Sequence, residues 1–159
     1  HAPHTLAVLL DDSLIALDPA LVPPLATTRV AAIGTADVEA VLAPLANPGL
    51  SRRPLTPVHP RLTVAADQGW QFGWTRRARG QWRWDDAVDV PLVEERELYR
   101  VGYGPIDAPF AVWSPDQPSL SLTEADRTNL RAAHGPGNFW VRQIGTFDQS
   151  APLLLASLS

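Results

Sequence analysis

Three large aromatic residues, Trp70, Phe72 and Trp74, occupy alternate positions in the middle of the chain. Side chains at alternate positions of a β-strand point to the same face, so this spacing predicts a strand with one aromatic face. Residues 97–103 alternate in the same way, with Tyr, Val and Tyr on one face. Each aromatic ring buries about 150–250 Å² when it enters a core. The two patterns therefore predict neighbouring core strands of a β-sandwich, joined by a long connection.

Short strands separated by turn signals recur from residue 58 onward. The predicted strands are 58–65, 70–74, 97–103, 110–113, 120–122, 138–146 and 153–158. Pro60 places the first strand at a sheet edge, because proline donates no hydrogen bond to a β-ladder. About seven strands in roughly 100 residues are typical of immunoglobulin-like and fibronectin type III sandwiches. The sequence contains no Cys, which excludes the antibody-type disulfide and favours a fibronectin type III-like sandwich.

One helix is expected within this all-β region, over residues 123–134. Thr123 can serve as the N-cap residue, with Asp126 as a capping-box-like partner three positions later. Gly135 ends the pattern. We expect the helix to bridge the two sheets and to bury Leu122 and Leu130.

The domain boundaries in our prediction are a β-rich segment over residues 1–53 and the sandwich over residues 54–159. Residues 6–10 and 27–33 predict strands, and 14–17 fits the returning arm of a hairpin. Residues 37–45 fit either a short helix or a strand that ends at Pro44. Few strands give little stability by themselves. We therefore expect the segment to end a preceding domain, completing a sheet elsewhere in a longer protein or packing on the sandwich.

Composition and motifs argue against most kinds of chemistry. The net charge of −4 lacks the basic excess typical of nucleic-acid binding. No run approaches the roughly 20 apolar residues that span a bilayer. Without Cys there is no thiolate nucleophile or thiolate metal site. The G-x-S-x-G, P-loop and G-x-G-x-x-G patterns are absent, and His59 and His134 are too few for a metal site. We expect no catalytic residue, no metal and no cofactor.

The surface candidates for binding are Trp82, Arg79 and Trp113. Trp82 and Arg79 belong to an Arg- and Trp-rich stretch that could recognise a partner through cation–π contacts. Trp113 precedes a Ser-Pro turn. The alternative is an internal ladder of arginine and aromatic side chains, with glutamates 94, 95 and 97 supplying counter-charges to the arginines, and we favour it. We likewise favour a packed core over a sugar-stacking platform for the aromatic row of residues 70–74.

A cluster of carboxylates follows the same stretch, at residues 85, 86, 89 and 94. Paired carboxylates can hydrolyse glycosides, and clustered carboxylates can bind Ca²⁺. A glycosidase normally takes its acid and base from separate strand ends, and no EF-hand spacing is present. We therefore interpret the cluster as a solvated acidic loop that balances the arginines.

Three segments together resemble one family: PLTPVHPR (54–61), WTRRAR (74–79) and WRWDDAVDVPLVEERELYRV (82–101). They are similar to the C-terminal region of the tail hub proteins of gene transfer agents, also called host-specificity or megatron tail proteins. The matching positions in the third segment are Trp84, Asp85, Asp89, Val90, Pro91, Leu92, Glu94, Glu95, Tyr99 and Val101. The resemblance covers residues 54–158 and extends more weakly over 5–50. Gly73, Thr75 and Pro60 depart from the family pattern.

The resemblance implies a component of a phage-like tail or baseplate, in which fibronectin-like modules decorate the hub. The glycosidase-like domain of that family is not matched, so no catalytic residue is carried over. The expected partners are other tail or baseplate proteins and a host-surface glycan or protein, with no nucleic acid and no membrane span. The expected location is the tail of a virion or virion-like particle assembled in the cytoplasm.

We therefore expect a non-enzymatic structural and binding module that contributes to tail-tip assembly and host-surface contact. The alternative is a carbohydrate-binding accessory module of a bacterial glycoside hydrolase. Saturable sugar binding would favour this alternative.

Overall fold

The computed structural model describes residues 15, 18, 21, 23–79 and 92–159. The chain divides into two compact units, His1–Ser51 and Arg52–Ser159, and each is described by itself. A short 3₁₀ helix, η1 (Leu50–Arg52), contains the boundary between them.

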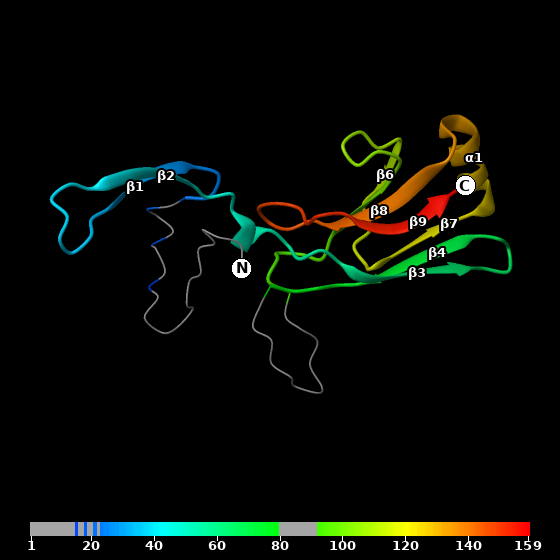
Figure 1. The fold of residues 1–159 in the computed structure, drawn as a ribbon. Helices are drawn as coiled ribbons and strands as arrows, with labels where there is room; N and C mark the ends of the chain where they lie inside the picture. The colour runs from blue at the N-terminus through cyan, green and yellow to red at the C-terminus, as the bar shows by residue number, and fades with distance from the viewer. Residues whose placement is uncertain (1–14, 16–17, 19–20, 22, 80–91) are drawn as a thin grey trace, which may run out of the picture. The chain divides into compact units, whose positions relative to one another are not determined.

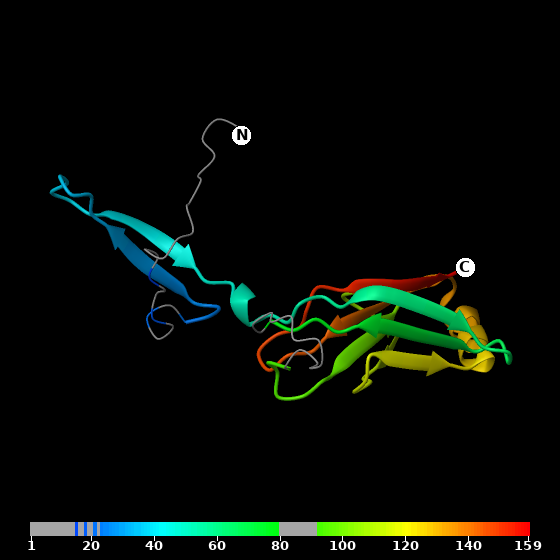
Figure 2. The same cartoon turned by 90° about the horizontal axis from the view of Figure 1, so that it is seen from below.

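The second unit is a sandwich of two antiparallel sheets (Figure 1). The three-stranded sheet consists of β3 (Val58–Val64), β4 (Trp70–Thr75) and β7 (Ser119–Leu122), in the order β3-β4-β7. The four-stranded sheet consists of β5 (Tyr99–Tyr103), β6 (Ala111–Trp113), β8 (Gly137–Gln143) and β9 (Leu153–Leu158), in the order β6-β5-β8-β9. Figure 2 shows β3, β4 and β7 running side by side. This arrangement confirms the predicted all-β, fibronectin type III-like sandwich.

Phe139 lies at the centre of the core between the two sheets. It is fully buried, as are Phe72 and Tyr103. The centroid of its ring is 5.0 Å from that of Phe72 and 4.7 Å from that of Tyr103. Aromatic pairs at such separations add to the stabilisation that burial alone provides. The two alternating patterns of the sequence therefore meet at Phe139, on a third strand.

The predicted aromatic face of β4 is confirmed. Phe72 and Trp74 are buried, and the Trp74 ring packs edge-on against Tyr99 with 5.1 Å between centroids. Trp70, at the start of the strand, is only partly buried, and the guanidinium of Arg127 lies 4.6 Å from the centroid of its ring. The row is therefore part of the core and not a flat sugar-binding platform.

The edge position predicted for the first strand of the sandwich is also confirmed. β3 pairs with β4 on one side only, and the register shifts between Val58 and Arg61. Pro60 falls within this irregularity, and His59 has a φ of 51°. A bulge with a proline interrupts the free edge and reduces the tendency of the strand to pair with another chain.

Helix α1 (Glu124–His134) connects β7 of one sheet to β8 of the other, as predicted. Thr123 caps it: Asp126 N donates to Thr123 Oγ1 at 3.1 Å, and Thr123 N donates to Asp126 Oδ2 at 3.0 Å. Leu122 is buried as expected, whereas Leu130 is partly buried against the core. The Tyr103 hydroxyl donates to Gly135 O at 2.6 Å and so fastens the end of the helix to β5.

Replacing Thr123 by Ala should lower the free energy of unfolding by about 1 kcal/mol, because the first turn of α1 loses its capping oxygen. Urea denaturation monitored by tryptophan fluorescence measures this change. Thr128→Ala is the matched control, since Thr128 is exposed within the same helix. Equal destabilisation by both substitutions would contradict the capping role.

The described part of the first unit contains an antiparallel hairpin of β1 (Thr27–Ala32) and β2 (Val41–Ala46). The strand predicted at 27–33 is confirmed. The helical alternative for 37–45 is wrong, and the strand does not end at Pro44, because Pro44 lies within β2 opposite Arg29. Almost all side chains of the two strands are exposed. The predicted strand 6–10 and most of 14–17 lie outside the described residues.

Candidate functional site

A buried ion pair joins the two ends of the connection between β4 and β5. Nε and Nη2 of Arg79 donate to Oε1 of Glu94 at 2.9 and 2.6 Å. The side chain of Glu94 is 3% exposed and that of Arg79 is 17% exposed. The expectation that Glu94 supplies a counter-charge to the arginines is confirmed. The interpretation of Glu94 as part of a solvated acidic loop is wrong, because its side chain is buried. Arg79 was a predicted surface candidate for binding. In the structure its guanidinium forms this ion pair with Glu94.

The second carboxylate oxygen of Glu94 reaches the loop between β8 and β9. Thr146 N donates to Glu94 Oε2 at 2.8 Å. Gly145 permits the close approach, because a Cβ there would lie 2.7 Å from Glu94 Oε2 and 2.4 Å from Pro54 Cγ. Glu94 therefore holds together the β4–β5 connection and the β8–β9 loop, at the place where Pro54 leads into β3.

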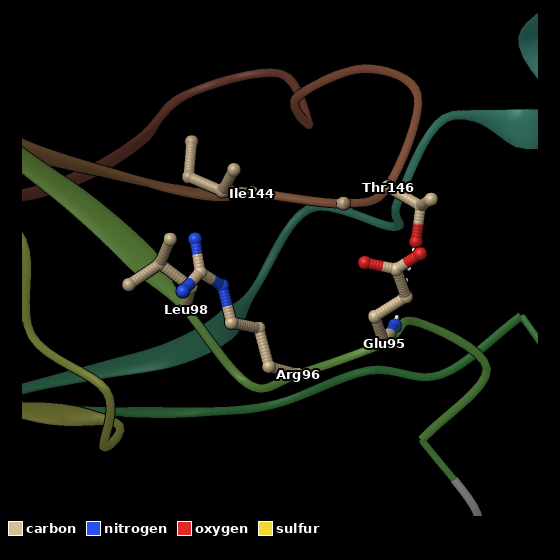
Figure 3. A pocket seen from close by; sticks show the side chains of 6 residues that line it. Glu95, Arg96, Leu98, Ile144 and Thr146 are labelled. Atoms are coloured by element: carbon tan, nitrogen blue, oxygen red, sulfur yellow. Dashed lines mark hydrogen bonds between the residues drawn. The ribbon is translucent and has the colours of Figure 1, made fainter.

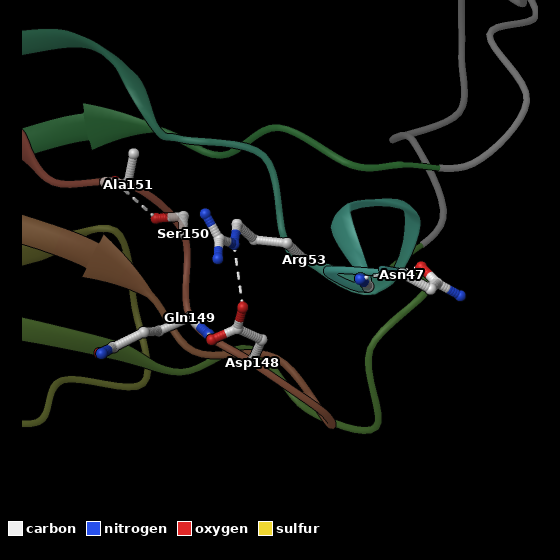
Figure 4. A network of polar contacts seen from close by, with 7 residues as sticks. Asn47, Arg53, Asp148, Gln149, Ser150 and Ala151 are labelled. Carbon is white, nitrogen blue, oxygen red and sulfur yellow. Dashed lines mark hydrogen bonds and ion pairs between the residues drawn. The ribbon is translucent and has the colours of Figure 1, made fainter. Parts of the chain in front are cut away.

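A second ion pair fixes the same loop to the start of the sandwich (Figure 4). Arg53 Nε donates to Asp148 Oδ2 at 2.9 Å, and Gln149 N donates to Asp148 Oδ1 at 2.7 Å. The guanidinium of Arg52 lies 4.7 Å from the centroid of the Phe147 ring. Two consecutive arginines thus hold two consecutive loop residues.

The pKa of Asp148 is lowered, first by the hydrogen bond from Gln149 N and then by that from Arg53. A lowered pKa in the folded state means that the ionised carboxylate stabilises the fold above the pKa of the unfolded chain. This contribution disappears as the pH falls through the folded-state pKa.

We therefore expect the thermal midpoint to fall between about pH 5 and about pH 3. Asp148→Asn should melt at a lower temperature than the unmodified chain near neutral pH, but should lose less stability on acidification. Melts by circular dichroism across this range measure both effects, with exposed Asp116→Asn as the control. A variant with the same acid dependence as the unmodified chain would contradict the assignment.

Tyr99 contributes a third polar contact, at the core end of the β4–β5 connection. Its hydroxyl donates to Glu97 Oε1 at 2.6 Å, and Arg76 Nε lies 3.7 Å from Glu97 Oε2. Burial, and then the hydrogen bond to Glu97, raise the pKa of Tyr99 far above its usual value. The phenol therefore stays protonated and acts as a fixed donor. The pairing predicted for this arginine–glutamate cluster is confirmed here as well.

Trp113 lies elsewhere, in a surface pocket of about 390 Å³ lined by residues of α1, β6 and β7. Trp113, Leu122 and Leu130 give the pocket an apolar side, and Asp126, Asn129 and His134 supply polar groups. Trp113 also packs on the core. Trp82 lies outside the described residues, as do the predicted acidic residues 85, 86 and 89.

The contacts of Glu94 and Asp148 in the β8–β9 loop were not predicted from the sequence. Thr146 lies 52 positions from Glu94, and Asp148 lies 95 positions from Arg53. Only the order of the strands brings these residues together. The charges of Arg53 and Asp148 were visible in the sequence, but no spacing rule links residues so far apart.

Within the part of the chain that the structure describes, no three His, Cys, Asp or Glu side chains are grouped closely enough to hold a metal ion. Among the same residues, no helix is long and apolar enough to cross a membrane.

No protein-family model and no curated protein matches this sequence. Two solved structures are similar in shape. One is domains d3–d4 of the rat CD45 extracellular region, at 8% identity and a TM-score of 0.42, covering 99% of this chain and 76% of that chain. The other is a two-domain fibronectin type III segment of chicken tenascin, at 15% identity and a TM-score of 0.41, covering 84% of this chain and 63% of that chain.

Proposed function

We propose that this chain is a non-catalytic structural and binding module of a phage-like tail hub or baseplate protein. One observation supports the proposal above the others. Arg79 ends one of the segments that resemble the tail hub family, and Glu94 belongs to the next such segment. The two residues form the buried ion pair that joins the ends of the β4–β5 connection. Arg79 and Glu94, which belong to the resembling segments, thus make the fold rigid, and an assembly module requires a rigid fold.

In this role the sandwich presents a stiff surface at the tail tip. Glu94 and Asp148 hold the described ends of the β4–β5 connection and the β8–β9 loop, so little conformational entropy is lost when a partner binds to these residues. The partners in this proposal are other tail or baseplate proteins and a molecule of the host surface. Its place is the tail of a virion or virion-like particle assembled in the cytoplasm.

Particle fractionation tests the role. An epitope tag on the parent protein should co-purify with tailed particles from the producing bacterium, and antibody-gold labelling should mark one end of the tail. Absence of the tag from particles that contain the capsid and tail-tube proteins would overturn the proposal.

A second candidate function is carbohydrate binding, and the Trp113 pocket favours it. An aromatic ring beside carboxylate and amide groups suits a sugar, because the ring packs on its apolar face and the polar groups bond its hydroxyls. A glycan array followed by calorimetric titration would test this function. Sugar binding that is lost both in Asn129→Ala, a substitution at an exposed position, and in Trp113→Phe would support carbohydrate binding. Trp82→Ala tests the candidate that lies outside the described residues.

A further inference from the structure

Two arginines stand directly opposite each other on the outer face of the four-stranded sheet. The register pairs Arg100 of β5 with Arg142 of β8. The residues that flank them on both strands are buried, so the alternation of side chains turns both arginines away from the core. Like charges directly opposite each other destabilise an antiparallel pair. The fold therefore tolerates an unfavourable juxtaposition in a chain whose net charge is −4.

Within the described residues, no carboxylate forms an ion pair with Arg100 or Arg142. The ion pairs of the sandwich there join Arg53 to Asp148, Arg76 to Glu97 and Arg79 to Glu94. Arg142 lies near enough to lower the pKa of Asp148, but the carboxylate bonds Arg53. The Nε atom of Arg142 is shielded from solvent and has no hydrogen-bond partner, and its guanidinium lies 5.8 Å from the centroid of the Trp140 ring.

A small pocket with both polar and apolar lining residues continues the same face toward the β8–β9 loop. Ile144 N donates to Leu98 O at 2.8 Å, which extends the strand pairing by one step beyond the buried residues Tyr99 and Gln143. Leu98 and Ile144 therefore share the face of the two arginines. With Arg96, Gly145 and Thr146 they line a pocket of about 160 Å³. Figure 3 shows Arg96 beside Leu98, with Glu95 on the side of Thr146.

The chemistry of this face selects among anionic partners. Guanidinium groups bind planar carboxylates through paired hydrogen bonds. Leu98 and Ile144, the two apolar side chains of the pocket, offer nothing to a free anion, but they can contact a small apolar side chain. Glu95 at the rim repels a polymer that carries negative charge throughout its length. An acidic peptide with interspersed apolar side chains satisfies all three features.

We propose that the outer face of β5 and β8 is a docking surface for an acidic, apolar-containing peptide segment of a partner protein. Arg100 and Arg142 bind its carboxylates, Arg96 binds a further one at the pocket, and the pocket takes an adjacent apolar side chain. The proposal refines the binding role proposed above. The docking proposal and the tail role are tested independently, because the peptide experiment uses this chain alone and the tail role is tested on particles.

Fluorescence anisotropy of the full 159-residue chain with a labelled octapeptide of alternating Glu and Leu tests the surface. Binding should weaken about tenfold or more in Arg100→Glu, which removes a charge-assisted contact and adds repulsion. The control is Arg61→Glu, an equal change of charge at an exposed position of β3, and it should leave binding unchanged. Arg96→Glu should weaken binding as well. Circular dichroism melts of each variant separate lost binding from lost folding.

Two further probes separate the parts of the recognition. A peptide with Gln in place of Glu should not bind, and a peptide with Ser in place of Leu should bind several-fold more weakly. Raising the salt from about 50 to about 300 mM should weaken binding of the first peptide. Equal losses in Arg100→Glu and Arg61→Glu, the absence of any peptide binding, or a heparin oligosaccharide that binds more tightly than the peptide and depends on Arg100 would each overturn the proposal.

Discussion

Replacing Glu94 by Gln should lower the free energy of unfolding by about 3 kcal/mol, because one partner of a buried ion pair is removed. Both oxygens of Glu94 accept from donors, Arg79 on one side and Thr146 N on the other. A Gln side chain has one oxygen and one amino group. Its amino group would therefore face a hydrogen-bond donor, either the Arg79 guanidinium or Thr146 N, and that hydrogen bond would be lost. The ion pair between Glu94 and the largely buried Arg79 is lost as well.

Chemical denaturation of the two variants Glu94→Gln and Glu95→Gln measures the effect. Glu95 is the neighbouring glutamate but is exposed, so its substitution should change the free energy of unfolding by less than about 0.5 kcal/mol. The double variant with Arg79→Gln should lose less than the sum of the two single substitutions, because the two residues interact directly. Similar losses in the two single variants would show that Glu94 does not hold the loops together.

The core strands β4 and β5 were predictable because one face of each strand carries large, buried apolar side chains and the other does not. In β4 and β5 the buried aromatic residues alternate with polar or small ones, and that alternation is a local property of the sequence. The cap of α1 was predictable for the same reason, since Thr123 and Asp126 are three residues apart. The pairing of arginines with glutamates could be predicted as a type of contact, but the individual partners depend on how the β4–β5 connection returns to the sheet.

Other features have no local signal. Gly102 lies on β5 opposite Trp140, and a Cβ there would come within 2.1 Å of Cζ2 of the indole. The indole Nε1 donates to Gly104 O at 3.1 Å, and Trp140 is only 3% exposed although the register places it on the outer face. In the sequence, Gly102 is simply a glycine within a strand, and only the packed sheet shows that it makes room for a ring. The Arg100–Arg142 pair likewise depends on register between strands that are separated by more than thirty residues.

The centre of the core should be the most sensitive position of all. Phe139→Ala should lower the free energy of unfolding by about 4 kcal/mol, through lost burial and the cavity that remains. Phe139 has no exposed surface, and its ring touches those of Phe72 and Tyr103 from the two alternating strands. The cavity would open where both sheets meet, so neither sheet can close it without moving away from the other.

Phe147→Ala provides the matched control, because it removes the same side chain from a loop position that is 64% exposed. It should cost less than about 1 kcal/mol, mainly through the lost contact with Arg52. Guanidinium denaturation of both variants, followed by fluorescence and circular dichroism, compares them under one set of conditions. If Phe139→Ala were no more destabilising than Phe147→Ala, the two alternating strands would not share a core at Phe139. The sandwich would then have to be held together mainly by its loop contacts, through Glu94 and Asp148.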